Sequence, residues 1–273
     1  MGTLYLVATP IGNLDDITLR ALRILSQVEL VAAEDTRQTQ KLFERHAIHN
    51  RLISYHEHNK ISRTAELVDA LSKGDVALVS DAGTPGVNDP GFELVRAAIL
   101  AGFPVSPVPG PSAPLAALVA SGLPTDAFLY LGYLPRKESE RRRFLEQVKS
   151  APYTLVFLET PHRLCAALHD CISILGDRSA AVARELTKVH EEIMRAPLTE
   201  LHAHFSTIEP RGEFTLVIEG VLDPIETWTQ EAVDEAIQQG IHHGDAPGEL
   251  ATRIAGLSGW RKNQVYRRII SIQ

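Results

Sequence analysis

The sequence predicts an α/β protein made of two α/β domains followed by a short C-terminal helical module. Up to Gly220, short apolar runs rich in β-branched residues alternate with amphipathic segments, the pattern of strands and helices in α/β folds. The turn-rich stretch 122–126 interrupts this alternation once, and after Gly220 the pattern is helical only. We therefore expect domains at residues 1–122 and 123–222, and a helical module at 223–273.

Nine apolar runs predict the strands. They are Leu4–Thr9, Val28–Ala33, Leu52–Tyr55, Val76–Ser80, Val105–Val108, Phe128–Leu134, Thr154–Leu158, Ala180–Ala183 and Phe214–Glu219. Because strands that alternate with helices usually run parallel, we expect mostly parallel sheets covered on both faces. The first helix is expected over Ile17–Val28, capped by Asp15 or Asp16.

The C-terminal module is predicted to contain a helix-turn-helix-like pair. Ala246–Glu249 opens the first helix, which carries apolar Leu250, Ala251 and Ile254, and Gly256–Gly259 forms the turn. The second helix carries Val265, Ile269 and Ile270 on its apolar side.

The overall charge is acidic but unevenly distributed. The chain has 27 basic and 34 acidic residues, a formal net charge of −7. Between Glu249 and Gln273, however, five basic residues stand against one glutamate, and Arg136–Lys149 holds six basic residues against three glutamates. Two local basic patches can still meet a polyanion, so the global charge does not exclude RNA as a partner. No apolar run approaches the roughly 18–20 residues of a membrane-spanning helix.

Three loops rich in glycine and proline each follow a predicted strand. They are Thr9–Leu14, Ser80–Gly91 and Val108–Ala113. The carboxyl ends of parallel strands form the edge where α/β sheets bind ligands, and glycine lets a ligand approach the backbone. Each loop alone could be ordinary turn chemistry, but three on one edge favour a shared binding site.

Other common sites are not supported by the sequence. It lacks G-x-G-x-x-G, G-x-x-x-x-G-K-[ST] and G-x-S-x-G, which argues against an ordinary dinucleotide site, a P-loop and a serine-hydrolase elbow. The pairs His56/His58 and His242/His243 lack further ligands in a zinc pattern. We therefore expect no metal.

The opening run Val7–Thr18, together with Ser80–Gly91 and Val108–Ala113, resembles the motifs of the tetrapyrrole (corrin/porphyrin) methylase superfamily. The resemblance covers about residues 3–220. Five further segments resemble the subfamily that methylates the 2′-hydroxyl of a cytidine in 16S ribosomal RNA, rather than the pigment-pathway enzymes. These segments are Ala33–Arg37, His56–Asn59, Gly132–Pro135, Glu159–Arg163 and Arg184–Lys188.

The resemblance implies a cleft between two α/β domains that holds S-adenosylmethionine, in a homodimer acting on 16S rRNA or the assembled small ribosomal subunit. The two cysteines, Cys165 and Cys171, are expected to be core thiols in a reducing cytoplasm. Carried over to this sequence, it implies a set of cofactor-binding residues: Pro10, Asp81, Ala82, Gly83, Thr84, Val87, Ser112, Ala113, Leu158 and Thr215. Backbone N–H groups would take the ligand's carboxylate and an apolar wall would shield its adenine.

Methyl transfer to a ribose hydroxyl requires alignment and removal of one proton. The expected catalytic residues are Asp35, Arg37, His56, Glu159 and Lys188, with Asp81 and Glu191 as further candidates for the base. Structural alternatives remain open for several of them. Asp35 could cap a helix or pair with Arg37, Asp81 could fix its loop, and Lys188 and Glu191 could be an exposed helical charge pair.

Phosphates are expected to bind basic residues of the two patches, namely Arg141, Arg142, Arg143, Arg261, Lys262, Arg267 and Arg268. A solvated charged face is the alternative. Two other functions also remain open. A methylase acting on a corrin or another small molecule would need no basic tail, and a non-enzymatic RNA-binding protein would bind no cofactor.

Overall fold

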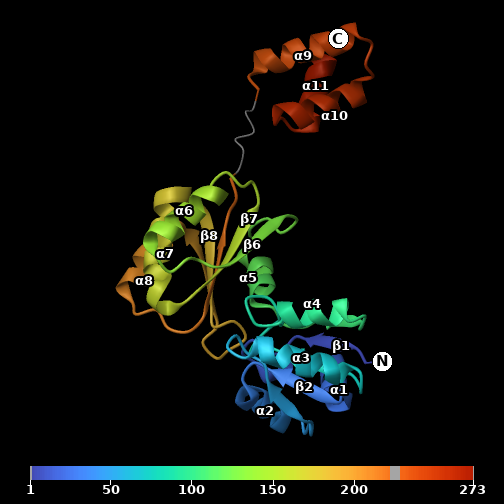
Figure 1. The fold of residues 1–273 in the computed structure, drawn as a ribbon. Coiled ribbons are helices and arrows are strands. Elements are labelled where there is room, and N and C mark those ends of the chain that lie inside the picture. Colours follow the sequence, from blue (N-terminus) through green and yellow to red (C-terminus); the bar gives the residue numbers. More distant parts are fainter. Residues whose placement is uncertain (1, 222–227, 273) are drawn as a thin grey trace. The chain divides into compact units, whose positions relative to one another are not determined.

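The computed structural model describes residues 2–221 and 228–272. Met1–Glu219 form one compact unit and Gly220–Gln273 form a second one (Figure 1). Each unit has its own apolar core. No helix within the described ranges has both the length and the apolar character required to span a membrane.

The first half of the large unit contains a five-stranded parallel sheet. In spatial order its strands are β3 (Leu52–Ser54), β2 (Leu30–Ala33), β4 (Val76–Val79), β1 (Leu4–Val7) and β5 (Val105–Val108). Every neighbouring pair is parallel, as predicted. The carboxyl ends of β4, β1 and β5 therefore lie next to one another, and these are the ends from which the three glycine- and proline-rich loops leave.

Helices cover both faces of this sheet. They are α1 (Leu19–Gln27), α2 (Thr36–Arg45), α3 (Lys60–Leu71) and α4 (Phe92–Leu100). Successive strand residues point to opposite faces. Val31 and Ala33 accordingly pack with α1 and α2, whereas Leu30 and Ala32 pack with α3 and α4. Continuous apolar strands of this kind are typical of parallel sheets buried on both sides.

The start of α1 differs from the prediction. Thr18, not Asp15 or Asp16, is the N-cap residue, and its hydroxyl accepts a hydrogen bond of 3.1 Å from the Ala21 N–H. Both aspartates lie in a separate 3-10 turn. Ile17 has extended backbone angles and a buried side chain, so the helix cannot begin before Thr18.

The second half contains a mixed sheet. In spatial order its strands are β6 (Phe128–Tyr133), β7 (Thr154–Glu159), β10 (Phe214–Ile218), β8 (Ser179–Arg184) and β9 (Glu192–Pro197). Only β6 and β7 pair in parallel, among the strands of the described ranges; the other three pairs are antiparallel. The prediction of mostly parallel sheets is therefore wrong for this half.

The cause lies partly in β9, which the sequence analysis missed. Its residues Glu192–Pro197 carry charges and a proline and are largely exposed at the sheet edge, where such residues are tolerated. The seven residues between β8 and β9 are too few for the helical crossover that parallel strands require.

The two faces of the second sheet are covered differently. Helices α6 (Glu138–Val148), α7 (Leu164–Leu175) and α8 (Leu198–Thr207) lie on one side, and α5 (Ala113–Ser121) lies on the other (Figure 1). Ala117 and Leu118 of α5 pack against Val156, Ala183 and other strand residues. Because α5 follows directly on β5 of the first sheet, the two halves are tied together next to the loop that opens α5.

The second unit consists of α9 (Gln230–His242), α10 (Pro247–Ser258) and α11 (Lys262–Ile272). The predicted helix pair is confirmed, and α9 completes its core. Val265 and Ile269 are buried as expected, but Ile270 is 54% exposed. At Gly240 a Cβ atom would come within 2.2 Å of Leu250, so the close packing of α9 on α10 requires glycine there.

Candidate functional site

A cavity of about 320 Å³ opens at the carboxyl edge of the first sheet and is walled on its other side by the second sheet. Its lining residues are Ile11, Glu34, Asp81, Ala82, Gly83, Thr84, Val87, Asn88, Asp89, Ser112, Ala113, Pro114, Tyr130, Tyr133, Leu158, Glu159, Ala183, Leu186, Glu213, Phe214 and Thr215. All three predicted ligand loops contribute to this lining, and the volume is in the range of small-molecule sites.

The first two loops are joined by backbone hydrogen bonds. The Thr9 N–H donates to the Gly83 carbonyl at 2.8 Å, and the Gly83 N–H donates to the Thr9 carbonyl at 3.0 Å. The Thr9 hydroxyl also donates to the Ser80 carbonyl at 3.1 Å. Gly83 has φ +75°, a left-handed conformation that glycine adopts without strain. The backbone of the second loop is thus held against the cavity.

The third loop ends at the N-terminus of α5. Ser112 is the N-cap residue, but its side chain forms no capping hydrogen bond, and Pro114 stands in the first turn. The backbone N–H groups that begin the helix therefore have no side-chain cap. A helix N-terminus of this kind, lining a cavity through Ser112 and Ala113, favours a negatively charged ligand group.

The second sheet contributes the opposite wall. Leu158 and Thr215 face the cavity from the paired strands β7 and β10, with Leu186 from the segment that follows β8. That segment touches the first loop directly, since the Asn13 N–H donates to the Thr187 hydroxyl at 3.0 Å. A Cβ at Gly12 would come within 2.5 Å of Lys188. Glycine at position 12 therefore permits this contact.

One end of the cavity is acidic. Glu34, Asp81 and Asp89 line it together. Burial and the nearby Glu34 carboxylate raise the pKa of Asp89 to about 6, and burial also raises the pKa of Glu34. This end therefore favours a cationic ligand group and contains a carboxylate able to hold a proton near neutral pH.

Two tyrosines lie beside this acidic end. The Tyr130 hydroxyl donates to Asn88 Oδ1 at 2.5 Å, and burial raises the pKa of Tyr130 to about 12. Burial also raises the pKa of Tyr133, a side chain that is 50% exposed. Both hydroxyls therefore stay protonated at neutral pH.

Nine of the ten residues expected to bind the cofactor line this cavity, namely Asp81, Ala82, Gly83, Thr84, Val87, Ser112, Ala113, Leu158 and Thr215. Pro10 is buried and lies outside the lining, next to Ile11, which is part of it. The structure thus brings together residues 134 positions apart in the chain.

Of the five expected catalytic residues, only Glu159 lines the cavity. Asp35 is the N-cap of α2, accepting from the Arg37 N–H at 2.9 Å, and pairs with the Arg37 guanidinium at 2.6 Å. Hydrogen bonds from Arg37 lower the pKa of Asp35 to about 2. His56 lies outside the lining, with its Nδ1 buried and without a partner in the described chain and its Nε2 3.2 Å from Asn59 Nδ2.

Lys188 holds other residues in place. Its ammonium group contacts Glu185 at 2.9 Å and Glu213 at 3.1 Å, and Glu213 lines the cavity. Glu191 accepts a hydrogen bond of 2.6 Å from the Thr187 N–H. The alternative of an exposed helical charge pair between Lys188 and Glu191 is wrong, because this segment is a turn that connects β8 to β9.

The basic residues expected to bind phosphates fall into two groups. Arg141 is 5% exposed and paired with buried Asp170, so its assignment to RNA is wrong. Arg142 contacts the same carboxylate at 2.8 Å, and Arg268 contacts Asp234 at 2.5 Å. The remaining four are exposed and have no acidic side-chain partner within the described ranges. They are Arg143, Arg261, Lys262 and Arg267.

Five further residues line the site although the sequence did not predict them, namely Glu34, Asn88, Asp89, Tyr130 and Tyr133. A signal existed for Asn88 and Asp89, which lie in the second ligand loop, and for Glu34 and Tyr133, which lie in segments that mark the subfamily. None existed for Tyr130, because only the packing of β6 against the second loop brings it to the cavity. No cluster of metal-binding side chains occurs among the residues that the structure describes.

Comparisons with known proteins identify the family of this chain. Residues 3–202 match the Tetrapyrrole (Corrin/Porphyrin) Methylases. A curated protein of Micromonospora olivasterospora, "Ribosomal RNA small subunit methyltransferase I", is 47% identical over 270 residues, 98% of this chain and 86% of that protein. A protein of the same name from Thermotoga maritima is 45% identical over 221 residues, 81% of this chain but 99% of its own length.

Among solved structures, a uroporphyrin-III C-methyl transferase from Thermus thermophilus, complexed with S-adenyl homocysteine, shares the fold. Its TM-score is 0.56 at 22% identity, covering 80% of this chain and 97% of that one. The family match over 200 residues and the identities above 40% settle the relationship. This chain belongs to the tetrapyrrole (corrin/porphyrin) methylase family and, within it, to the group of ribosomal RNA small subunit methyltransferase I.

Proposed function

We propose that this protein transfers a methyl group from S-adenosylmethionine to the ribose 2′-hydroxyl of a cytidine in 16S rRNA. The observation that carries the proposal is the cavity shared by the three ligand loops and the second sheet. The relatives named ribosomal RNA small subunit methyltransferase I support the RNA substrate. Mapping 2′-O-methyl groups in 16S rRNA from cells with and without the protein tests it directly, because a missing cytidine methylation is expected only in the deletion strain.

The chemistry of the cavity lining fits this cofactor. Ser112 and Ala113, at the uncapped start of α5, suit the carboxylate of the methionine portion. Asp81 at the acidic end suits the ammonium or sulfonium charge, and Leu158 and Leu186 offer an apolar wall for the adenosine. The pocket thus offers one region for each part of a zwitterionic sulfonium ligand.

When bound, the cofactor supplies a methyl carbon already activated by a positively charged sulfur. The protein must therefore align the hydroxyl oxygen with that carbon and accept the hydroxyl proton. We assign proton acceptance to Asp89, because it lines the cavity and burial raises its pKa to about 6. Asp35 and His56 lie outside the lining, so we propose that they position this part of the fold.

Replacing Asp89 by Asn is expected to lower turnover by about 100-fold or more, the usual contribution of a general base. In the wild type, kcat/KM should rise with pH through about 6 and then level off, since only the carboxylate accepts the proton. The bound cofactor is cationic and stabilises the carboxylate form of Asp89. The pH at which kcat rises should therefore be lower than the pH at which kcat/KM rises. A pH–rate profile measures both limbs, and Asp126→Asn, at an exposed loop position, serves as the control.

The second unit is proposed to engage RNA. Arg261, Lys262 and Arg267 are its exposed cations without an acidic partner in the described chain. The Thermotoga maritima relative matches over only 221 residues, 99% of its own length, which supports a cofactor site contained in the first unit. Removal of Gly220–Gln273 should spare cofactor affinity but weaken acceptor binding.

Changing Arg261, Lys262 and Arg267 together to Gln tests this without disturbing the buried core. Loss of about three phosphate contacts is expected to reduce the slope of log affinity against log salt by about 2. Filter binding of 16S rRNA over a range of salt concentrations measures the slope. An unchanged slope would exclude this face from RNA contact.

We further propose that the protein acts in the cytoplasm as a homodimer. We also propose that each chain is divided into three domains, at 1–122, 123–222 and 223–273. Exposed apolar side chains on α4 and α5, among them Phe92, Ile99 and Val119, support a buried interface there. Sedimentation of the purified protein tests the dimer.

A further inference from the structure

Tyr133 ends β6 at the cavity, and residues 134–136 form the loop that follows it. Tyr133 lines the cavity and is 50% exposed, and its hydroxyl has no hydrogen-bond partner in the described part of the chain. A Cβ at Gly132 would come within 2.6 Å of Asn88 Nδ2, so this strand end packs directly on the second ligand loop. Tyr133 thus borders both the cavity and the solvent.

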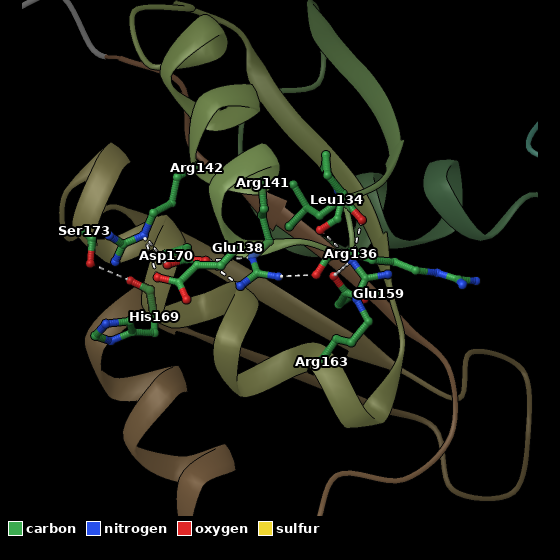
Figure 2. Close-up of polar contacts among 11 residues, drawn as sticks. Leu134, Arg136, Glu138, Arg141, Arg142, Glu159, Arg163, His169, Asp170 and Ser173 are labelled. Atoms are coloured by element: carbon green, nitrogen blue, oxygen red, sulfur yellow. Dashed lines mark hydrogen bonds and ion pairs between the residues drawn. The ribbon is translucent and has the colours of Figure 1, made fainter.

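Two guanidinium groups hold the main chain just after Tyr133. Arg163 donates to the carbonyls of Leu134 and Pro135, the latter at 3.2 Å, and Arg141 donates to the Arg136 carbonyl at 3.3 Å. Figure 2 shows these contacts converging on the loop. Three consecutive carbonyls are therefore fixed by side chains that come from α6 and from the turn before α7.

Buried carboxylates fix the two arginines in turn. Asp170, whose side chain is 2% exposed, contacts Arg141 at 2.6 Å. Glu159, whose side chain is fully buried, forms an ion pair with Arg163 at 3.2 Å. A loop supported in this way is held in one geometry before any ligand arrives, which is what a precise binding site requires.

The same loop carries a cation that the network does not use. The Arg136 side chain extends away from the dashed contacts in Figure 2. It is exposed, and among the described residues no acidic side chain pairs with it. The loop therefore has an exposed Arg136 guanidinium three positions after the half-exposed Tyr133 ring.

The charges of the cavity restrict what can enter. Its acidic end is lined by Glu34, Asp81 and Asp89, and no basic side chain lines the cavity within the described chain. This end repels phosphate groups, so we expect an RNA acceptor to insert its ribose while its phosphates remain outside. In a stacked helix the ribose of a nucleotide cannot enter a cavity while its phosphates stay outside, whereas the ribose of an unstacked nucleotide can.

We propose that Tyr133 and Arg136 form the subsite for the acceptor nucleotide, with the base stacked on the Tyr133 ring and a backbone phosphate bound by Arg136. The ligand is an unpaired nucleotide of single-stranded RNA, and the inference rests on the proposed function. Stacking on an aromatic ring offsets part of the cost of leaving the helical stack, and arginine is suited to phosphate. Arg141 and Arg163 are positioning residues for this subsite.

Steady-state methyl transfer to small ribosomal subunits lacking the modification, with cofactor binding measured separately by calorimetry, tests the proposal. Tyr133→Ala should lower kcat/KM for the acceptor about 10- to 100-fold, the value of one base stacked on an aromatic ring. Cofactor affinity should stay within about twofold of wild type, a change below 1 kcal/mol. Tyr133→Phe should recover most of the loss, because the ring and not the hydroxyl carries the stacking.

Arg136→Ala should raise the acceptor KM and reduce the salt slope by about 0.7, the value of one contact to single-stranded RNA. Tyr153→Ala is the matched control, since Tyr153 is 45% exposed and precedes β7 at the end opposite the cavity. Arg23→Ala, an exposed position on α1, is the control for the cation. Both controls should match wild type.

The outcomes separate this proposal from the function on which it rests. A wild-type protein that binds the cofactor but does not methylate the subunits would refute the proposed function itself. An active wild type with the same acceptor kcat/KM in Tyr133→Ala would overturn the subsite. A Tyr133→Ala loss matched by an equal loss of cofactor affinity would overturn it too, because Tyr133 would then belong to the cofactor site.

Discussion

Replacing Gly83 by Val is expected to reduce cofactor affinity by about 100-fold or more, the scale on which filling a binding site with side-chain atoms removes ligand contacts. Gly83 lines the cavity and has φ +75°. A Cβ at this position would lie 3.6 Å from Ile11 Cγ2 and 3.8 Å from the Pro111 carbonyl oxygen. These are ordinary contact distances, so the protein without ligand has room for the added atom. The added isopropyl group would instead occupy space the ligand needs, and calorimetry with S-adenosylmethionine measures the loss.

Gly86→Val is the matched control for backbone strain. Gly86 has φ +81°, a Cβ there would meet no atom within 4 Å, and the residue is outside the cavity lining. Both substitutions therefore place a β-branched residue in the left-handed region, at a cost of about 1–3 kcal/mol each. If Gly83→Val bound the cofactor as well as Gly86→Val does, the cavity would not be the cofactor site.

The largest effect on stability is expected for Asp170→Ala. Asp170 accepts hydrogen bonds from Arg141 Nε at 2.7 Å and from Arg142 Nε at 2.8 Å, and the Arg141 side chain is 6% exposed. Removing the carboxylate leaves a buried guanidinium without its counter-charge, which costs about 3–5 kcal/mol. Urea unfolding, followed by circular dichroism, should show the free energy of unfolding reduced by that amount.

Arg142→Ala provides the comparison, because Arg142 is 41% exposed and Asp170 retains Arg141 in that variant. We expect a loss below about 1 kcal/mol, as for other exposed ion pairs. Replacing both buried partners, Arg141→Met with Asp170→Leu, should recover part of the stability lost in Asp170→Ala. An Asp170→Ala protein as stable as Arg142→Ala would contradict the assignment of Arg141 to the core.

The cofactor side of the site was predictable because it depends on local features. The loops Thr9–Leu14, Ser80–Gly91 and Val108–Ala113 each follow a strand of a parallel sheet, and β4, β1 and β5 are neighbours. Parallel strands bring such loops to one edge whatever the remaining details of packing. Family motifs then identified Leu158 and Thr215 on the second sheet.

The catalytic and RNA-binding residues were less predictable, because charged side chains change role with their surroundings. Asp35 and Arg37 pair with each other at the start of α2. Asp89 is marked in the sequence only by its place in the second ligand loop, and its raised pKa comes from burial beside Glu34. Arg141 and Arg143 are two residues apart, yet one is buried against Asp170 and the other is exposed.

By itself the sequence determined the alternation of strands and helices, the positions of the three ligand loops and the membership of the family, since periodicity, turn residues and motifs are local properties of the chain. Only the tertiary structure decided that the second sheet is mixed, that α5 is shared between the two halves, and which carboxylates and tyrosines meet at the cavity. Those outcomes depend on burial and on contacts between residues far apart in the chain, which no local pattern encodes.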